Sequence, residues 1–164
     1  MNTQFRWKKK FFSRSYKIYS GNQILGKLES RFFSRLSRAK LKGQKYLFRT
    51  KGLLRQTTTI YNGSENSRLG TIKYTLWSAS ADINLAEKEY RWMYNNFRYT
   101  MWSITGSDGV NIKYSRSFTK GQIQGNTDDP VLLFTGLFIH GYLSMVTMIY
   151  VLLFILIVIN WIII

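Results

Sequence analysis

Apolar and polar residues alternate with a period of two along most of residues 4–127. In the segment 71–76, for example, Ile72, Tyr74 and Leu76 alternate with polar residues. Such alternation is typical of antiparallel strands with one face on a core. Asn-Gly, Asp-Gly and similar turn sequences interrupt it at short intervals. We therefore predict a mainly β fold with about twelve strands. The predicted strands are 4–11, 14–20, 22–29, 36–42, 45–51, 54–62, 67–77, 79–86, 89–96, 98–106, 110–117 and 120–126.

A run of hairpins this long predicts a closed antiparallel barrel. One face of each strand should then point to a common interior. The predicted core residues are Tyr16, Ile18, Ile24, Leu28, Leu41, Tyr46, Phe48, Ile60, Ile72, Tyr74, Leu76, Ile83, Tyr90, Trp92, Ile112, Leu132 and Phe134.

The pattern ends at residue 131, after which no Lys, Arg, Asp or Glu occurs. An uncharged apolar run longer than about 18 residues predicts a membrane-spanning helix. Residues 131–164 would reach about 51 Å as a helix, which exceeds a hydrocarbon core of about 30 Å. We therefore predict three parts: a barrel module over 1–129, a helix over 130–144 that fills the barrel, and a transmembrane continuation over 145–164.

The start of this helix carries its own signals. Asp129 followed by Pro130 predicts an N-cap with proline at the first helical position. The pair Asp128-Asp129 also allows part of a calcium site, although two ligands are few for that cation. Capping is therefore the favoured interpretation.

One face of the predicted helix carries Gly136, His140 and Ser144 at a spacing of four. We interpret them as small or polar residues that let a neighbouring element approach closely. A proton or ligand site is the alternative, but no carboxylate lies within a turn of His140 to tune the imidazole.

Basic residues are concentrated in the first third of the chain. Residues 1–55 hold 16 Lys or Arg and one Glu, a net +15, whereas residues 56–130 hold 8 against 7, a net +1. A basic surface beside a membrane meets anionic headgroups, which predicts anionic phospholipid as a partner. A role in solubility and in blunting strand edges is the alternative. The candidate lipid-binding residues are Arg6, Lys8, Lys9, Lys10, Arg14, Lys17, Arg35, Arg38, Lys40 and Lys42.

The composition also restricts the chemistry. The chain has no Cys and only one His, and no phosphate-binding loop or metal-ligand spacing is present in the sequence. We therefore predict a binding protein rather than an enzyme, with no cofactor and no metal. Residues 1–10 are basic without an apolar segment behind them, so we expect no secretory signal. Because Lys and Arg flank the apolar run only on its N-terminal side, residues 1–130 are predicted to be cytoplasmic.

Nucleic acid and other membrane-protein subunits are two further classes of partner. Nucleic acid is disfavoured, because the aromatic residues near the basic ones alternate with them and should face the core instead of offering a stacking surface. A subunit of a larger membrane complex is the other alternative, since a single apolar helix with small residues is a common site of assembly.

Four passages are similar to the tubby C-terminal-like superfamily, which includes tubby domains, phospholipid scramblases and plant LURP-one-related proteins. They are Phe11–Leu28 (FFSRSYKIYSGNQILGKL), Gly43–Gly52 (GQKYLFRTKG), Leu69–Trp77 (LGTIKYTLW) and Lys120–Phe138 (KGQIQGNTDDPVLLFTGLF). The resemblance implies a twelve-stranded barrel around a hydrophobic helix, with phosphoinositide or anionic lipid as ligand. Scramblase-like lipid transport is a further implied function. The chain departs from scramblases in lacking a cysteine- and proline-rich N-terminal segment and a long acidic calcium loop.

Overall fold

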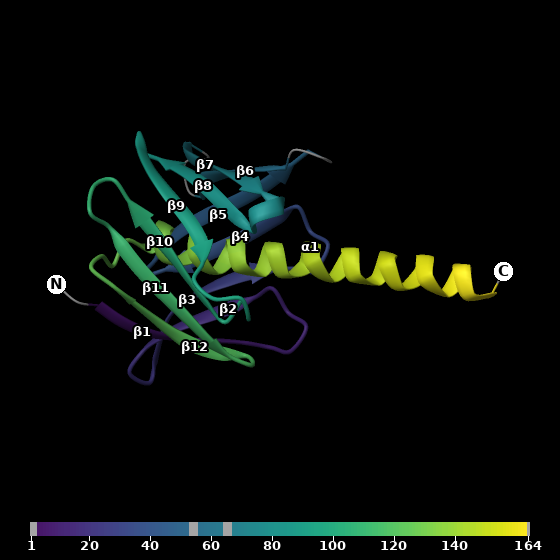
Figure 1. Cartoon of the computed structure of the whole chain (residues 1–164). Coiled ribbons are helices and arrows are strands. Elements are labelled where there is room, and N and C mark those ends of the chain that lie inside the picture. The colour runs from purple at the N-terminus through teal and green to yellow at the C-terminus, as the bar shows by residue number, and fades with distance from the viewer. Residues whose placement is uncertain (1–2, 53–55, 64–66, 164) are drawn as a thin grey trace.

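The computed structural model describes residues 3–52, 56–63 and 67–163 and shows a twelve-stranded barrel with a long C-terminal helix (Figure 1). The strands are β1 Thr3–Lys9, β2 Tyr16–Ser20, β3 Gln23–Ser30, β4 Leu36–Leu41, β5 Gln44–Lys51, β6 Thr57–Asn62, β7 Arg68–Thr75, β8 Ser80–Leu85, β9 Lys88–Tyr94, β10 Met101–Gly106, β11 Asn111–Ser117 and β12 Lys120–Gly125. The helices are the 3-10 helix η1 Leu76–Ser78 and α1 Pro130–Ile163.

Each strand pairs antiparallel with its sequence neighbour, and β1 also pairs with β12, which closes the sheet. At this closure Phe5 lies opposite Ile123, and Trp7 lies opposite Gly121. The closed barrel and the mainly β fold confirm the prediction from the period-two pattern. Closure leaves no free strand edge, so the basic residues are not needed to blunt one.

The first part of α1 fills the interior of the barrel, as expected. Residues 131–143 are all buried, and Phe138 stacks on Phe48 with 4.7 Å between the ring centroids. The Nε1–H groups of Trp92 and Trp102 both donate to the carbonyl oxygen of Gly136, at 3.2 and 3.1 Å. The barrel therefore has no hollow bore, because the helix supplies the centre of its core.

The helix begins as the sequence predicts. The Val131 N–H donates to Oδ1 of Asp129 at 2.9 Å, and the Leu133 N–H donates to the Asp129 carbonyl at 3.0 Å. Asp129 is thus the N-cap, and Pro130 occupies the first position, where its missing N–H is not needed. Asp128 lies 3.6 Å from Nζ of Lys42.

The core prediction is confirmed for most of its residues and wrong at two. Ile24 is exposed, because a register shift beside Tyr19 moves Ile24 to the outer face and leaves Leu25 packed against the core. Leu76 is exposed because β7 ends at Thr75 and the chain turns into η1 instead of continuing as a strand. Tyr74 is half-buried. Strand ends also differ: β1 stops at Lys9, and residues 54 and 55 of the predicted strand 54–62 lie outside the described residues.

The second part of α1 extends away from the barrel into open space (Figure 1). From Tyr150 to Ile162 every residue is exposed, and no charged residue occurs there. The nineteen described residues after Ser144, 145–163, are about 28 Å long, which is close to the thickness of the hydrocarbon core of a bilayer. By length and composition, α1 is the one described helix able to span a membrane.

Candidate functional site

The two ends of the barrel differ, because successive connections alternate between them. The connections after odd-numbered strands lie at the end from which α1 emerges, here called the exit end. This follows from the pairing order and from contacts such as Arg14 Nη1 to Met145 Sδ at 3.4 Å. The connections after even-numbered strands lie at the opposite end, where α1 begins.

Large apolar side chains are exposed in the connections of the exit end. The described part of the barrel exposes eleven such residues, of which eight lie there, and Trp77 is fully exposed. We call this set the exit ring: Phe11, Phe12, Phe33, Leu76, Trp77, Phe97, Tyr99 and Phe118. Turns normally carry polar residues, so a ring of aromatic turns around an emerging apolar helix is a candidate site of contact with a membrane or a partner protein.

Two of these turns have the same sequence and the same hydrogen bond. Phe11-Phe12-Ser13-Arg14 repeats as Phe32-Phe33-Ser34-Arg35. In the first turn the Ser13 N–H donates to the Lys10 carbonyl at 3.1 Å, and in the second the Ser34 N–H donates to the Arg31 carbonyl at 3.1 Å. Each turn thus holds two adjacent phenylalanines at its apex, packed edge to face at 4.4 and 4.8 Å between ring centroids.

Charge is distributed as unevenly as the aromatic residues. In the part of the chain that the structure describes, five exposed basic residues surround the exit ring, namely Lys10, Arg31, Arg35, Lys51 and Arg98. No described residue of the exit-end connections is acidic, whereas the opposite end carries Glu87, Asp108, Asp128 and Asp129. The barrel therefore presents a positive, aromatic end on the side where α1 leaves it.

The half-buried Lys9 lies just inside the exit end, with its Nζ 5.8 Å from the ring centroid of Tyr16. Burial lowers the pKa of Lys9, and the nearby positive charge of Arg116 lowers it further. Positive charge at this end is thus dense enough for its members to repel each other.

The structure separates the ten predicted lipid-binding residues into three groups. Lys9, Lys10, Arg14 and Arg35 lie at the exit end, and Lys42 lies at the opposite end. Lys8, Lys17, Arg38 and Lys40 are exposed on the wall formed by β1–β4. Arg6 is also on β1, but its Nη2 donates to the turn between β2 and β3, through the Gly21 carbonyl and Asn22 Oδ1.

Arg14 is the exception in this set, because its side chain is buried. Nη1 donates to the Phe32 carbonyl at 2.9 Å, and the guanidinium lies 5.9 and 5.7 Å from the ring centroids of Phe138 and Tyr142. Arg14 therefore fastens both Phe-Phe turns to α1 where the helix emerges. The sequence predicts Arg14 as part of the basic lipid-binding surface, but its side chain is buried. Its contacts give it a role in positioning the two turns against α1 instead.

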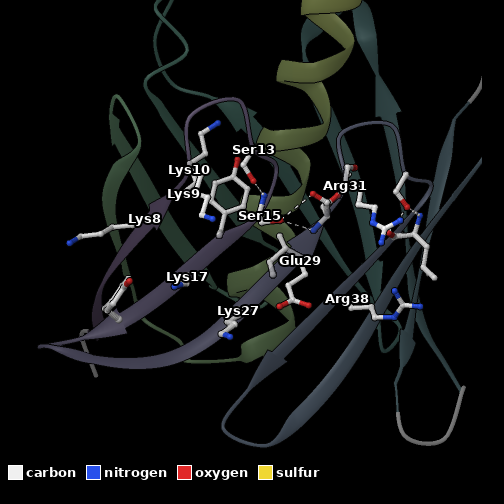
Figure 2. A pocket seen from close by; sticks show the side chains of 16 residues that line it. Lys8, Lys9, Lys10, Ser13, Ser15, Lys17, Lys27, Glu29, Arg31 and Arg38 are labelled. Carbon is white, nitrogen blue, oxygen red and sulfur yellow. Dashed lines mark hydrogen bonds between the residues drawn. The ribbon is translucent and has the colours of Figure 1, made fainter.

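The basic wall is hollowed into a groove of about 810 Å³ that opens near the exit end (Figure 2). Figure 2 shows Lys17 and Lys27 on neighbouring strands, Lys8 at one side with its side chain pointing outward, and Lys10 and Arg31 near the turns; all five line the groove. A second hollow of about 730 Å³ adjoins it and shares Lys27, Glu29 and Arg38 with it. The basic wall thus offers a continuous concave surface with one carboxylate.

The helix face of Gly136, His140 and Ser144 is enclosed by the barrel. A Cβ at Gly136 would lie 2.2 Å from the Tyr114 ring, so the absent side chain makes room for that tyrosine. The His140 ring stacks on Trp102 at 3.9 Å, and its Nδ1 is 3.0 Å from the Tyr94 hydroxyl. This geometry fits the close-approach interpretation.

The acidic pair at the helix start is already engaged by Lys42 and by the helix N-terminus. Among the described residues no group of three or more His, Cys, Asp or Glu is placed to hold a metal ion.

The exit ring was missed by the sequence reasoning, although the sequence contains a signal for it. The period-two pattern extended the first strand through Phe11, because a strand accommodates aromatic residues more readily than a turn does. The repeated Phe-Phe-Ser-Arg sequence, together with the alternation of connections between the two ends, would have located two of its turns.

Comparison of the chain with models of protein families, with curated proteins and with solved structures finds no match. Membership of the tubby-like superfamily stays a prediction, and the functional argument depends on the geometry alone.

Proposed function

We propose that this protein is a membrane-anchored β-barrel that binds anionic phospholipid headgroups, with its exit end docked on the cytoplasmic leaflet. Three features support the proposal because they lie at the same end of the barrel. They are the emerging apolar helix, the exit ring, and exposed basic residues in connections where no described residue is acidic. Residues 145–164 would cross the bilayer, and residues 1–130 would remain in the cytoplasm, in line with the positive-inside rule.

The exit ring and the basic residues suit different parts of the membrane surface. Aromatic side chains are enriched where hydrocarbon meets headgroups, so the exit ring suits that depth. Each Lys or Arg near an anionic surface contributes roughly 1 kcal/mol. Because the helix already attaches the barrel, these contacts would fix its orientation instead of supplying the attachment.

The alternative functions receive less support. The small-residue face of α1 is enclosed in the barrel, so it is not available to pack on another membrane helix. In the exposed part of α1, Asn160 donates to the Leu156 carbonyl of its own helix at 2.8 Å. The described residues outside the barrel therefore offer no polar track for lipid transport. Membership of the tubby-like superfamily would agree with lipid binding, but the proposal is based on the geometry of the exit end alone.

Flotation with liposomes tests the proposal. The fragment 1–144 keeps the buried helix and removes the anchor, so its binding reports on the barrel alone. We expect it to float with vesicles of phosphatidylcholine and phosphatidylserine, and much less with phosphatidylcholine alone.

Two variants with four substitutions each make the test specific to one surface. Replacing Lys10, Arg31, Arg35 and Arg98 by Gln should abolish the preference for phosphatidylserine. Replacing Lys17, Lys27, Lys40 and Lys45 by Gln removes the same charge from the wall and should retain the preference. Equal losses from both variants would contradict docking through the exit end.

A further inference from the structure

Six lysines form an unbroken row across six adjacent strands of the basic wall. The cross-strand pairs are Lys120 with Lys8, Lys8 with Lys17, Lys17 with Lys27, Lys27 with Lys40, and Lys40 with Lys45. All six side chains are exposed on the outer face. We call this row the lysine ladder.

Such a row is unfavourable for the folded barrel itself. Like charges directly opposite each other on neighbouring strands are destabilising, and the ladder contains five such pairs in succession. The closed barrel has no edge for lysines to protect. Solubility is served by charges of both signs interspersed over a surface. The aligned lysines therefore point to a ligand that neutralises them.

The surface over the ladder is concave. Lys8, Lys17 and Lys27 line the first hollow, and Lys27, Lys40 and Lys45 line the second (Figure 2 shows the first). The one acidic residue of this groove is Glu29, which lies opposite Arg38 in the pairing of β3 and β4. The remaining lysines have no carboxylate opposite them in the register.

The bilayer does not explain the far part of the ladder. Lys45 lies near the start of β5, six residues before Lys51 at the exit end, which is about 20 Å along a strand. Strands in barrels tilt by about 40°, so the height above the exit end is about 15 Å. Charges are screened within about 8 Å at physiological salt. Lys40 and Lys45 are therefore beyond the reach of headgroups when the exit end is docked.

We propose that the lysine ladder binds a linear phosphate polyanion, either a nucleic-acid backbone or inorganic polyphosphate, without reading sequence. Strands lie about 4.8 Å apart, so five steps extend over about 24 Å and match an elongated chain of charges. Lysine acts as a point charge toward phosphate and requires no fixed ligand geometry. This proposal does not depend on membrane docking.

The composition of the groove favours this ligand over a protein. Lysine is depleted in the cores of protein interfaces, which use aromatic anchors. The aromatic ring beside the ladder, Tyr19, is half-buried and already lies under Lys8, with 5.6 Å from Nζ to its centroid. Base stacking needs exposed aromatic rings, so the contact is expected to be with phosphates alone. The sequence-based argument against nucleic acid concerned base stacking, and binding through phosphates alone does not require a stacking surface.

The test uses the full chain in nanodiscs of phosphatidylcholine, where no anionic lipid competes. Fluorescence anisotropy with labelled oligothymidylate, and separately with labelled polyphosphate, is measured over a series of salt concentrations. Single-stranded nucleic acid gives a slope of log affinity against log salt of about −0.7 per phosphate contact, so the full ladder predicts about −4. Removing three lysines should reduce the slope to about −2.

The ladder variant is Lys17→Gln, Lys27→Gln and Lys40→Gln together. Its matched control is Arg68→Gln, Lys73→Gln and Lys113→Gln, which removes the same charge from exposed positions on β7 and β11. The control should keep the parent's slope. A third variant with Arg at Lys17, Lys27 and Lys40 retains the charge and should retain binding. The ladder variant should unfold at the same denaturant concentration as the parent or a higher one, since it removes like-charge pairs.

The possible results distinguish nucleic acid from polyphosphate, and both of these from an acidic protein segment. Ladder-dependent binding of polyphosphate alone, or of both probes, supports the proposal and identifies the source. Absence of binding by the parent overturns it, as do equal slopes for ladder variant and control. Equally tight, ladder-dependent binding of a labelled polyglutamate peptide overturns it in favour of an acidic protein segment. Since neutral nanodiscs are used, failure here leaves the flotation result for the exit end unaffected.

Discussion

At the scale of single residues, Arg14 and Arg35 occupy the same position in a repeated sequence but have different structural roles. Both end a Phe-Phe-Ser-Arg sequence at the exit end, but Arg14 is buried and Arg35 is exposed. Arg14→Gln should lower the free energy of unfolding by about 1.5–3 kcal/mol, because a charged hydrogen bond to the Phe32 carbonyl is lost in the interior. Arg35→Gln should change it by less than about 0.5 kcal/mol. Chemical denaturation followed by near-UV circular dichroism checks both, and equal effects would contradict the positioning role.

A second prediction at this scale concerns Gly136, the glycine of α1 at which an added Cβ would come closer to the barrel wall. A methyl group there would overlap the Tyr114 ring at 2.2 Å. Gly136→Ala should therefore destabilise the protein by about 1–3 kcal/mol through overpacking. Gly141→Ala is the control, because its Cβ would come no closer than 3.0 Å to Tyr16, the distance to the hydroxyl oxygen. If both variants melt alike, the close packing of α1 in the barrel is not as described.

At the scale of elements, the period-two pattern predicts the number of strands and the closed barrel, because each strand has one buried face. It fails where the chain leaves that pattern. The register shift beside Tyr19 turns Ile24 from the inner face of the barrel to the outer face. Such a bulge has no distinct signal in this sequence. The lysine ladder could not be predicted either, since it depends on the register of five strand pairs. Burial of Arg14 was missed because arginine is normally exposed.

The helix α1 allows a direct test at the element scale. Within the barrel it buries eight Val, Leu, Ile and Phe side chains, each contributing about 1.5–3 kcal/mol. Their loss is comparable with the whole stability of a typical domain, about 5–15 kcal/mol. The fragment 1–129 should therefore be unfolded, whereas 1–144 should show a cooperative thermal transition by near-UV circular dichroism. A soluble 1–129 fragment with the same transition would contradict the central role of the helix.

At the scale of the whole molecule, the two ends of the barrel differ in two properties. Its exit end carries aromatic turns and positive charge, and its opposite end carries acidic turns and the helix N-terminus. Both asymmetries share the axis of α1, so insertion of the helix alone would present the positive end to the membrane. The basic wall extends away from that end of the barrel. The two proposals therefore assign membrane docking and polyanion binding to different faces.

The most direct test of docking is the depth of the exit ring in a bilayer. The chain has no cysteine, so single spin labels can be attached through Trp77→Cys and Phe118→Cys at the exit end, and through Glu87→Cys and Ser107→Cys at the opposite end. In full-length protein in phosphatidylserine-containing nanodiscs, the account predicts that the first two labels are accessible to oxygen and shielded from a water-soluble nickel chelate. The other two should be accessible to the chelate. Equal access of the chelate to all four labels would contradict docking through the exit end.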